Sequence, residues 1–120
     1  MSTSPIEVGQ ITATALKARL DRGERIAVLD VREPVEREHC SIPLPVTARD
    51  LFIPMGELPG RLESLKEEAA TALVVVYCHL GVRSLQAARW LARQGVADLF
   101  NLEGGIDAWS VDVDPAVPRY

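Results

Sequence analysis

One cysteine in the sequence is placed where it could act as a nucleophile. Cys78 ends the apolar run LVVVYC at 73–78, and the residues that follow, HLGVRS, lead into a helical pattern. A loop that tightens into a helix N-terminus points successive backbone N–H groups, here those of residues 79–84, toward one spot, and the helix dipole adds positive charge there. We therefore expect an anion at the Cys78 sulfur to be stabilised.

The loop after Cys78 contains residue types that suit an anionic site. Gly81 lets the chain turn where a side chain would obstruct the sulfur. Arg83 cannot lose its charge, so it either supports the anion or orients an anionic substrate. His79 is a weaker candidate, because a preformed thiolate needs no general base. The predicted binding loop consists of His79, Leu80, Gly81, Val82, Arg83 and Ser84.

A structural role for Cys78 is the alternative, since most free cysteines are buried as small apolar side chains. The glycine, the arginine and the helix start that follow favour the reactive interpretation. Cys40 is the only other cysteine. It would be a resolving thiol only if its Cα lay within about 7 Å of that of Cys78, and we interpret it as a bystander.

Strands must carry this loop to the edge of a sheet. Apolar runs rich in β-branched residues predict buried strands at 27–31 and 73–78, a weaker strand at 99–102 and an edge strand at 51–53. In α/β domains, sites lie at the carboxyl ends of the strands. Cys78 occupies such an end.

Helical patterns alternate with these strands. The first helix follows Thr12 or Thr14 as its N-cap and stops before Gly23. A leucine-rich stripe predicts a second helix over 58–69, and the third follows Ser84. The predicted fold class is therefore α/β, with a central parallel sheet and helices on both faces.

Composition limits the chain to a few classes. Its 120 residues, 48% hydrophobic and 25% charged, predict one domain over 1–120, with 110–120 as an extended C-terminal tail. The longest apolar stretch, 72–78, is far short of the roughly 20 residues that span a membrane. Residues 1–10 resemble no secretory signal, so we expect a cytoplasmic protein without membrane association.

The charge and the content of metal-ligand residues argue against nucleic-acid binding and against a zinc site. The net charge is -4, and basic residues alternate with acidic ones, so no positive stripe is available for nucleic acid. Two cysteines and two histidines supply a zinc site poorly. We expect no bound metal.

The segment YCHLGVRS resembles the active-site loop of the rhodanese family, in which four residues separate the cysteine from an arginine. Four other segments are similar to the family's remaining signature segments and come in the expected order. The resemblance covers the chain from about Gln10 to Trp109. These segments are LDVREP at 29–34, SIP at 41–43, FIPMGELP at 52–59 and NLEGGIDAW at 101–109.

The resemblance implies a rhodanese-like fold and a sulfurtransferase in which Cys78 takes a sulfane sulfur from a donor such as thiosulfate. The sulfur then passes to a thiophilic acceptor, either a small molecule or a partner protein in a sulfur relay. Such nucleophilic catalysis needs no cofactor. Asp30, Arg32 and Glu33 follow a neighbouring strand, where we expect them to support the loop, with Arg32 also able to attract thiosulfate.

The chain departs from the family pattern in one place. Where many members have a histidine before IP and a glycine after it, this sequence has Ser41 and Leu44. A longer connection, PVTARDL, then precedes FIP. We therefore expect a local path of its own over residues 44–52.

Two other functions compete with sulfur transfer. A cysteine-dependent phosphatase or arsenate reductase also sets a thiolate and an arginine around an anion. However, the phosphatases that share this fold have five residues between them, whereas only four lie between Cys78 and Arg83. A non-catalytic rhodanese-like interaction module typically lacks the cysteine, which this chain retains.

Overall fold

In the computed structural model of the chain, which describes residues 8–120, five strands form one parallel sheet. The order across the sheet is β1-β5-β4-β2-β3, so that β4, the strand before Cys78, is central. This confirms the predicted α/β class. The strands are β1 (Gly9–Ile11), β2 (Ile26–Asp30), β3 (Arg49–Phe52), β4 (Leu73–Tyr77) and β5 (Leu99–Leu102).

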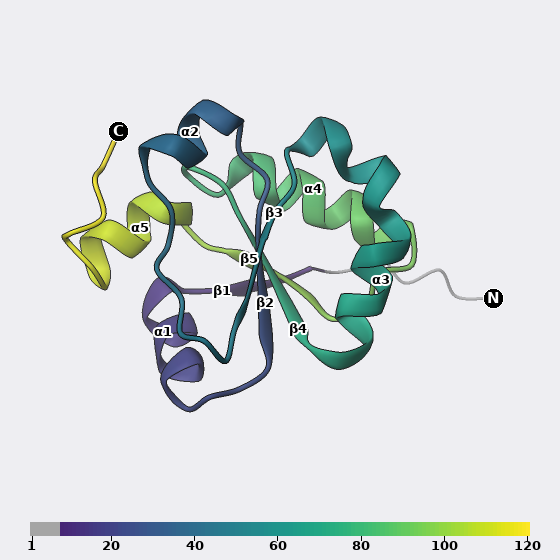
Figure 1. Cartoon of the computed structure of the whole chain (residues 1–120), viewed down its shortest axis with the longest axis horizontal. Coiled ribbons are helices and arrows are strands. Elements are labelled where there is room, and N and C mark those ends of the chain that lie inside the picture. Colours follow the sequence, from purple (N-terminus) through teal and green to yellow (C-terminus); the bar gives the residue numbers. More distant parts are fainter. Residues whose placement is uncertain (1–7) are drawn as a thin grey trace.

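Helices cover both faces of the sheet (Figure 1). On one face lie α1 (Ala13–Asp21) and α5 (Gly105–Asp112), and on the other α3 (Leu62–Thr71) and α4 (Val82–Arg93). The short α2 (Pro34–His39) follows β2 and lies near the C-terminal segment in Figure 1. None of the helices within residues 8–120 has the length and apolarity needed to cross a membrane.

Each sheet face packs its own apolar core, because successive strand side chains point to opposite faces. Val75 of β4 packs with Leu16 and Trp109 from α1 and α5, whereas its neighbours Val74 and Val76 face Leu65 and Leu91 from α3 and α4. Strands β2 and β4 are thus buried on both sides. Burial fixes their register and with it the position of the loop that follows β4.

The predicted strands are present, with small shifts. The strand expected to end at Cys78 ends at Tyr77, so the cysteine is the first residue of the loop. The edge strand runs over Arg49–Phe52, and the three-residue β1 was not predicted. Three residues are too few to show a period-2 pattern.

The helix predicted over 58–69 is wrong at its start. Residues Met55–Arg61 form a 3-10 helix, and α3 begins only at Leu62. Pro59 lies inside that first segment and has no N–H to donate, which favours the short 3-10 form over an α-helix. The first predicted helix is confirmed, with Thr12 Oγ1 accepting a hydrogen bond from the amide of Ala15.

The C-terminal segment is partly helical. Helix α5 reaches Asp112, three residues into the segment expected to be extended. Beyond it, Val117 is buried, and its carbonyl accepts a 2.6 Å hydrogen bond from Ser110 Oγ. The chain then returns toward α2 (Figure 1). Tyr120 lies edge-on to His39 there.

Candidate active site

Three hydrogen-bond donors of its own loop lie within reach of the Cys78 sulfur. The backbone amides of Gly81 and Ser84 lie 3.1 and 3.3 Å from Sγ, and the Ser84 hydroxyl lies 3.2 Å away. The expected cradle of main-chain amides is therefore present at the start of α4. Donors aimed at one sulfur stabilise its anionic form, because charge-assisted hydrogen bonds are about twice as strong as neutral ones.

Helix α5 holds the loop in this orientation. Its first amides, those of Ile106 and Asp107, donate to the carbonyls of Cys78 and His79 at 3.0 and 3.1 Å. With the carbonyls turned toward α5, the amides further along the loop face the sulfur. Gly105 makes this approach possible, because a Cβ there would lie 2.4 Å from the His79 carbonyl oxygen.

A polar chain extends from the sulfur across the sheet. Ser84 Oγ lies 2.5 Å from Asn101 Oδ1, while Asn101 Nδ2 donates to Gln10 Oε1 and to the Gly81 carbonyl. Ser84 has one hydroxyl proton, for which Asn101 and the sulfur compete. When Cys78 is a thiolate, this proton is the one available to turn toward it.

Asn101 and Gln10 were not among the predicted site residues. The sequence did carry a signal for Asn101, because it is a polar residue within the buried strand β5. It pairs with Val76 of β4, which lies two residues before Cys78. Buried polar side chains at the carboxyl ends of parallel strands point to a site. The sequence segment that contains Asn101, NLEGG, indicated only the family.

Replacing Ser84 by alanine removes the side-chain donor and leaves the two amide donors. A hydrogen bond to a charged group contributes about 1.5–3 kcal/mol, so we expect Ser84→Ala to slow sulfur loading of Cys78 roughly 10- to 100-fold. The measurement is the loading rate at neutral pH by intact mass. The matched control is Ser110→Ala, another buried serine, whose hydroxyl bonds Val117 away from Cys78. An equal loss in both variants would contradict a direct role of the Ser84 hydroxyl.

A small pocket lies at the cysteine loop. Cys78 is only 1% exposed, yet it lines a cavity of about 140 Å³ together with His79, Leu80, Val82 and Arg83. One water occupies about 30 Å³ of liquid, so the cavity has room for a second sulfur atom. Leu80 and Val82 are 58% and 65% exposed and form an apolar rim.

Arg83 does not face the pocket as a free cation. Its two Nη atoms bind the carboxylate of Glu36 at 2.7 and 2.8 Å. The Arg83 hydrogen bonds are the main reason that the pKa of Glu36 falls to about 2. The ion pair therefore contributes stability that is complete above the ordinary pKa of 4.5 and is lost only as the pH falls through about 2.

Glu36 was not among the residues predicted for the site. It belongs to a network with Arg83 and Tyr120 beside the pocket, and it also completes the capping box of α2 with Glu33. The pairing joins residues 47 positions apart. No local pattern in the sequence indicates it.

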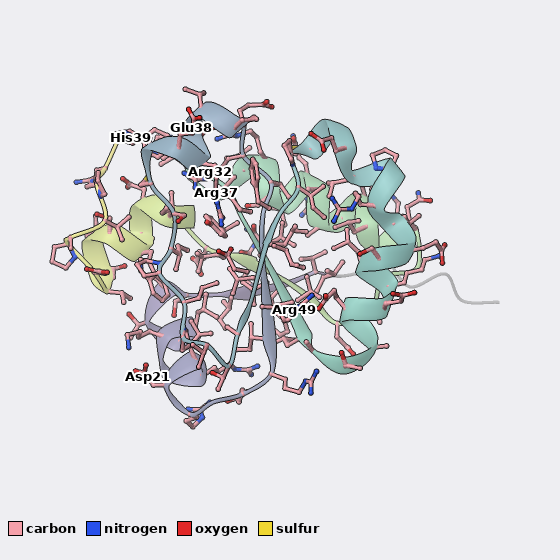
Figure 2. All side chains as sticks on the ribbon, viewed as in Figure 1. Asp21, Arg32, Arg37, Glu38, His39 and Arg49 are labelled. Atoms are coloured by element: carbon pink, nitrogen blue, oxygen red, sulfur yellow. The ribbon has the colours of Figure 1, made fainter. Side chains whose placement is uncertain are left out.

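Asp30 and Arg32 form a fully buried ion pair. Arg32 Nη2 lies 2.9 Å from Asp30 Oδ2, and Nε lies 2.9 Å from Oδ1. Arg32 also donates to the Cys40 carbonyl and to the Tyr120 hydroxyl. Figure 2 shows Arg32 and the neighbouring Arg37 between α2 and the sheet. A buried guanidinium with its donors occupied favours the expected supporting role of Arg32 over attraction of thiosulfate.

The His79 ring stacks on the ring of Tyr120, with centroids 3.9 Å apart and planes 9° apart. The Tyr120 hydroxyl bonds Arg32 at 2.9 Å and Glu36 at 2.7 Å. Burial is the main cause that raises the pKa of Tyr120 to about 12, so it stays neutral. Tyr120 thus links the buried ion pair to the loop, a contact that the sequence did not indicate. Cys40 is a buried free thiol.

Comparison with known families agrees with this geometry. The family described as "Rhodanese-like domain" matches residues 12–112. The chain belongs to the rhodanese-like family. Its five-stranded parallel sheet with flanking helices is therefore that of a rhodanese-like domain, as the sequence resemblance implied.

Relatives of this rhodanese-like domain include short and long proteins. A protein from Allochromatium vinosum named "Sulfurtransferase" is 35% identical over 103 residues, which cover 86% of this chain and 89% of that protein. The chloroplast "Rhodanese-like/PpiC domain-containing protein 12" of Arabidopsis thaliana is 36% identical over 97 residues, which cover 78% of this chain and 30% of that protein. This chain thus spans less than a third of that longer relative.

A solved structure shows the same fold. The rhodanese-like domain protein from Staphylococcus aureus superposes with a TM-score of 0.74 at 29% identity. The match covers 94% of this chain and 99% of that structure. The predicted rhodanese fold is confirmed.

Proposed function

We propose that this rhodanese-like domain is a sulfurtransferase that carries sulfane sulfur as a persulfide on Cys78. The observation that carries the proposal is the convergence of the Gly81 and Ser84 amides and the Ser84 hydroxyl on the sulfur of Cys78, a residue that lines a cavity. These donors stabilise the thiolate of Cys78 before the transfer and its persulfide after the transfer. The cavity holds one added sulfur.

The reaction is two displacements at sulfur. The Cys78 thiolate attacks the outer sulfur of the donor, the donor's S–S bond breaks, and its electron pair leaves with the remainder of the donor. With thiosulfate, the leaving group is sulfite. A thiophilic acceptor, either a small molecule or a protein in a sulfur relay, then attacks the outer sulfur of the persulfide and regenerates the thiolate. Covalent catalysis of this kind divides one transfer into two steps.

The geometry favours sulfur transfer over phosphate ester hydrolysis. A phosphatase needs its arginine free to bind a tetrahedral oxyanion, and here both Nη atoms of Arg83 bind Glu36. The loop also has one residue fewer than that of the related phosphatases. The cavity of about 140 Å³ is correspondingly small.

A paired assay tests the proposal. We expect incubation with a sulfane-sulfur donor, either thiosulfate or an organic persulfide, to add the mass of one sulfur to the protein. Cyanide should then remove that sulfur as thiocyanate. The same preparation should not hydrolyse an aryl phosphate. Efficient phosphate release without sulfur loading would overturn the proposal in favour of the phosphatase.

A further inference from the structure

The charge at the mouth of the Cys78 pocket is unusual for a site that takes an anionic donor. Arg83 is the one arginine or lysine among the residues that line the pocket. Its guanidinium is held in a two-pronged ion pair by Glu36, whose side chain is the more buried of the two partners. Because Glu36 ionises with a pKa of about 2, the pair is formed at every physiological pH.

The neighbouring charges offer no replacement for Arg83. Arg32 is buried against Asp30, and Arg119 is paired with Asp107 at 2.8 Å. A dianion that enters the pocket therefore meets a neutralised cation. It also approaches the carboxylate of Glu36, and like charges brought together without a partner repel each other.

The remainder of the pocket mouth is apolar. Leu80 and Val82 flank the sulfur on the loop, and more than half of each residue is exposed. Exposed apolar side chains beside a reactive group gain free energy by covering an apolar part of a ligand. Thiosulfate has no such part, whereas an organic persulfide, R–S–SH, has one in its R group.

We propose that Glu36 is a specificity-determining residue, which selects organic persulfides with an uncharged, apolar R group over the thiosulfate dianion. The inference rests on the proposed function, since it names the donor class of the same site. The R group covers Leu80 and Val82, and the Glu36 carboxylate cancels the charge of Arg83. Arg83 then acts as an anchor of the loop, not as a receptor for a dianion.

The transfer step from such a donor is balanced. The Cys78 thiolate attacks the terminal sulfur of R–S–SH, a new S–S bond forms at Cys78, and the bond between the two donor sulfurs breaks. The electron pair leaves with R–S⁻, and the terminal sulfur keeps its proton. No further oxidant or reductant takes part.

The test compares two donors in two variants of the full chain. Glu36→Gln removes the negative charge, and its amide oxygen can still accept one hydrogen bond from Arg83 and the one from Tyr120. Glu38→Gln is the matched control, because Glu38 lies on the same short helix and the net charge changes equally (Figure 2). Single-turnover loading of Cys78 by thiosulfate and by freshly generated benzyl persulfide is measured by quenched mass spectrometry.

We expect Glu36→Gln to raise the ratio of the thiosulfate rate constant to the benzyl persulfide rate constant about 10-fold, the lower end of the range for electrostatic guidance into a cleft. The rise should shrink as salt is added, because screening weakens a charge effect. A folding defect would lower both rate constants together and leave the ratio unchanged. Leu80→Ser should change the ratio in the same direction by slowing the benzyl persulfide reaction.

An unchanged ratio in Glu36→Gln, or an equal rise in Glu38→Gln, would overturn the specificity role while leaving the proposed function intact. A native protein that loads from thiosulfate faster than from benzyl persulfide would overturn it as well. If neither donor loads Cys78 in the native protein, the proposed function itself fails. The two failures are therefore distinguishable.

Discussion

Cys78→Ser is expected to abolish sulfur loading, to the level seen without protein. Serine keeps the size of the side chain and offers the Gly81 and Ser84 amides an oxygen in place of the sulfur. It cannot form the S–S bond that holds the transferred atom. The measurement is the intact mass of the variant after incubation with donor, followed by thiocyanate release on addition of cyanide.

Cys40→Ser is the matched control for this variant. Cys40 is the only other cysteine, and its sulfur lies near the buried guanidinium of Arg32 and outside the Cys78 cradle. We expect this variant to load one sulfur as the native chain does. If loading persists in Cys78→Ser and disappears in Cys40→Ser, the persulfide forms on Cys40 and the proposed Cys78 site is refuted.

The reactive loop could be predicted because its signals are local. A buried strand, a cysteine, a glycine and a helix start follow one another within 73–84, and each element obeys its own periodicity or turn rule. The direction of the amides toward Cys78 follows from the helix start alone. The structure adds the reason that the loop stays in place. The first amides of α5 bind two carbonyls of the loop, and Gly105 allows the close approach.

The mouth of the pocket could not be predicted in the same way. Glu36, Arg83 and Tyr120 come from three separate segments, and only the folded chain brings them together. A glutamate in a charged helical turn usually faces solvent, so its local sequence favoured the wrong environment. Arg83 was correctly placed beside the site, but the sequence could not show that its charge is already neutralised.

The Asp30–Arg32 pair leads to the second large expected effect, which is on stability. Arg32→Met retains a long apolar side chain and removes the charge. Asp30 is then left as a buried carboxylate that keeps only the backbone amide of residue 32 at 3.0 Å and the 3.3 Å contact to Arg37, the one cation still near it. Breaking a buried pair by removing one partner costs about 3–5 kcal/mol, a large part of the roughly 5–15 kcal/mol that stabilises a typical domain. Urea denaturation at neutral pH measures the loss.

Two further variants test whether the loss of stability in Arg32→Met comes from a buried, unpaired charge or from substitution in general. Arg49→Met breaks a 2.6 Å ion pair with Glu68 in which the arginine side chain is 63% exposed. It should leave the urea midpoint nearly unchanged, because exposed pairs contribute little. The double variant Asp30→Asn with Arg32→Met should be more stable than Arg32→Met alone, since no buried charge remains without a partner. If the double variant is the less stable, the cost lies in lost hydrogen bonds to Cys40 and Tyr120 and not in the stranded carboxylate.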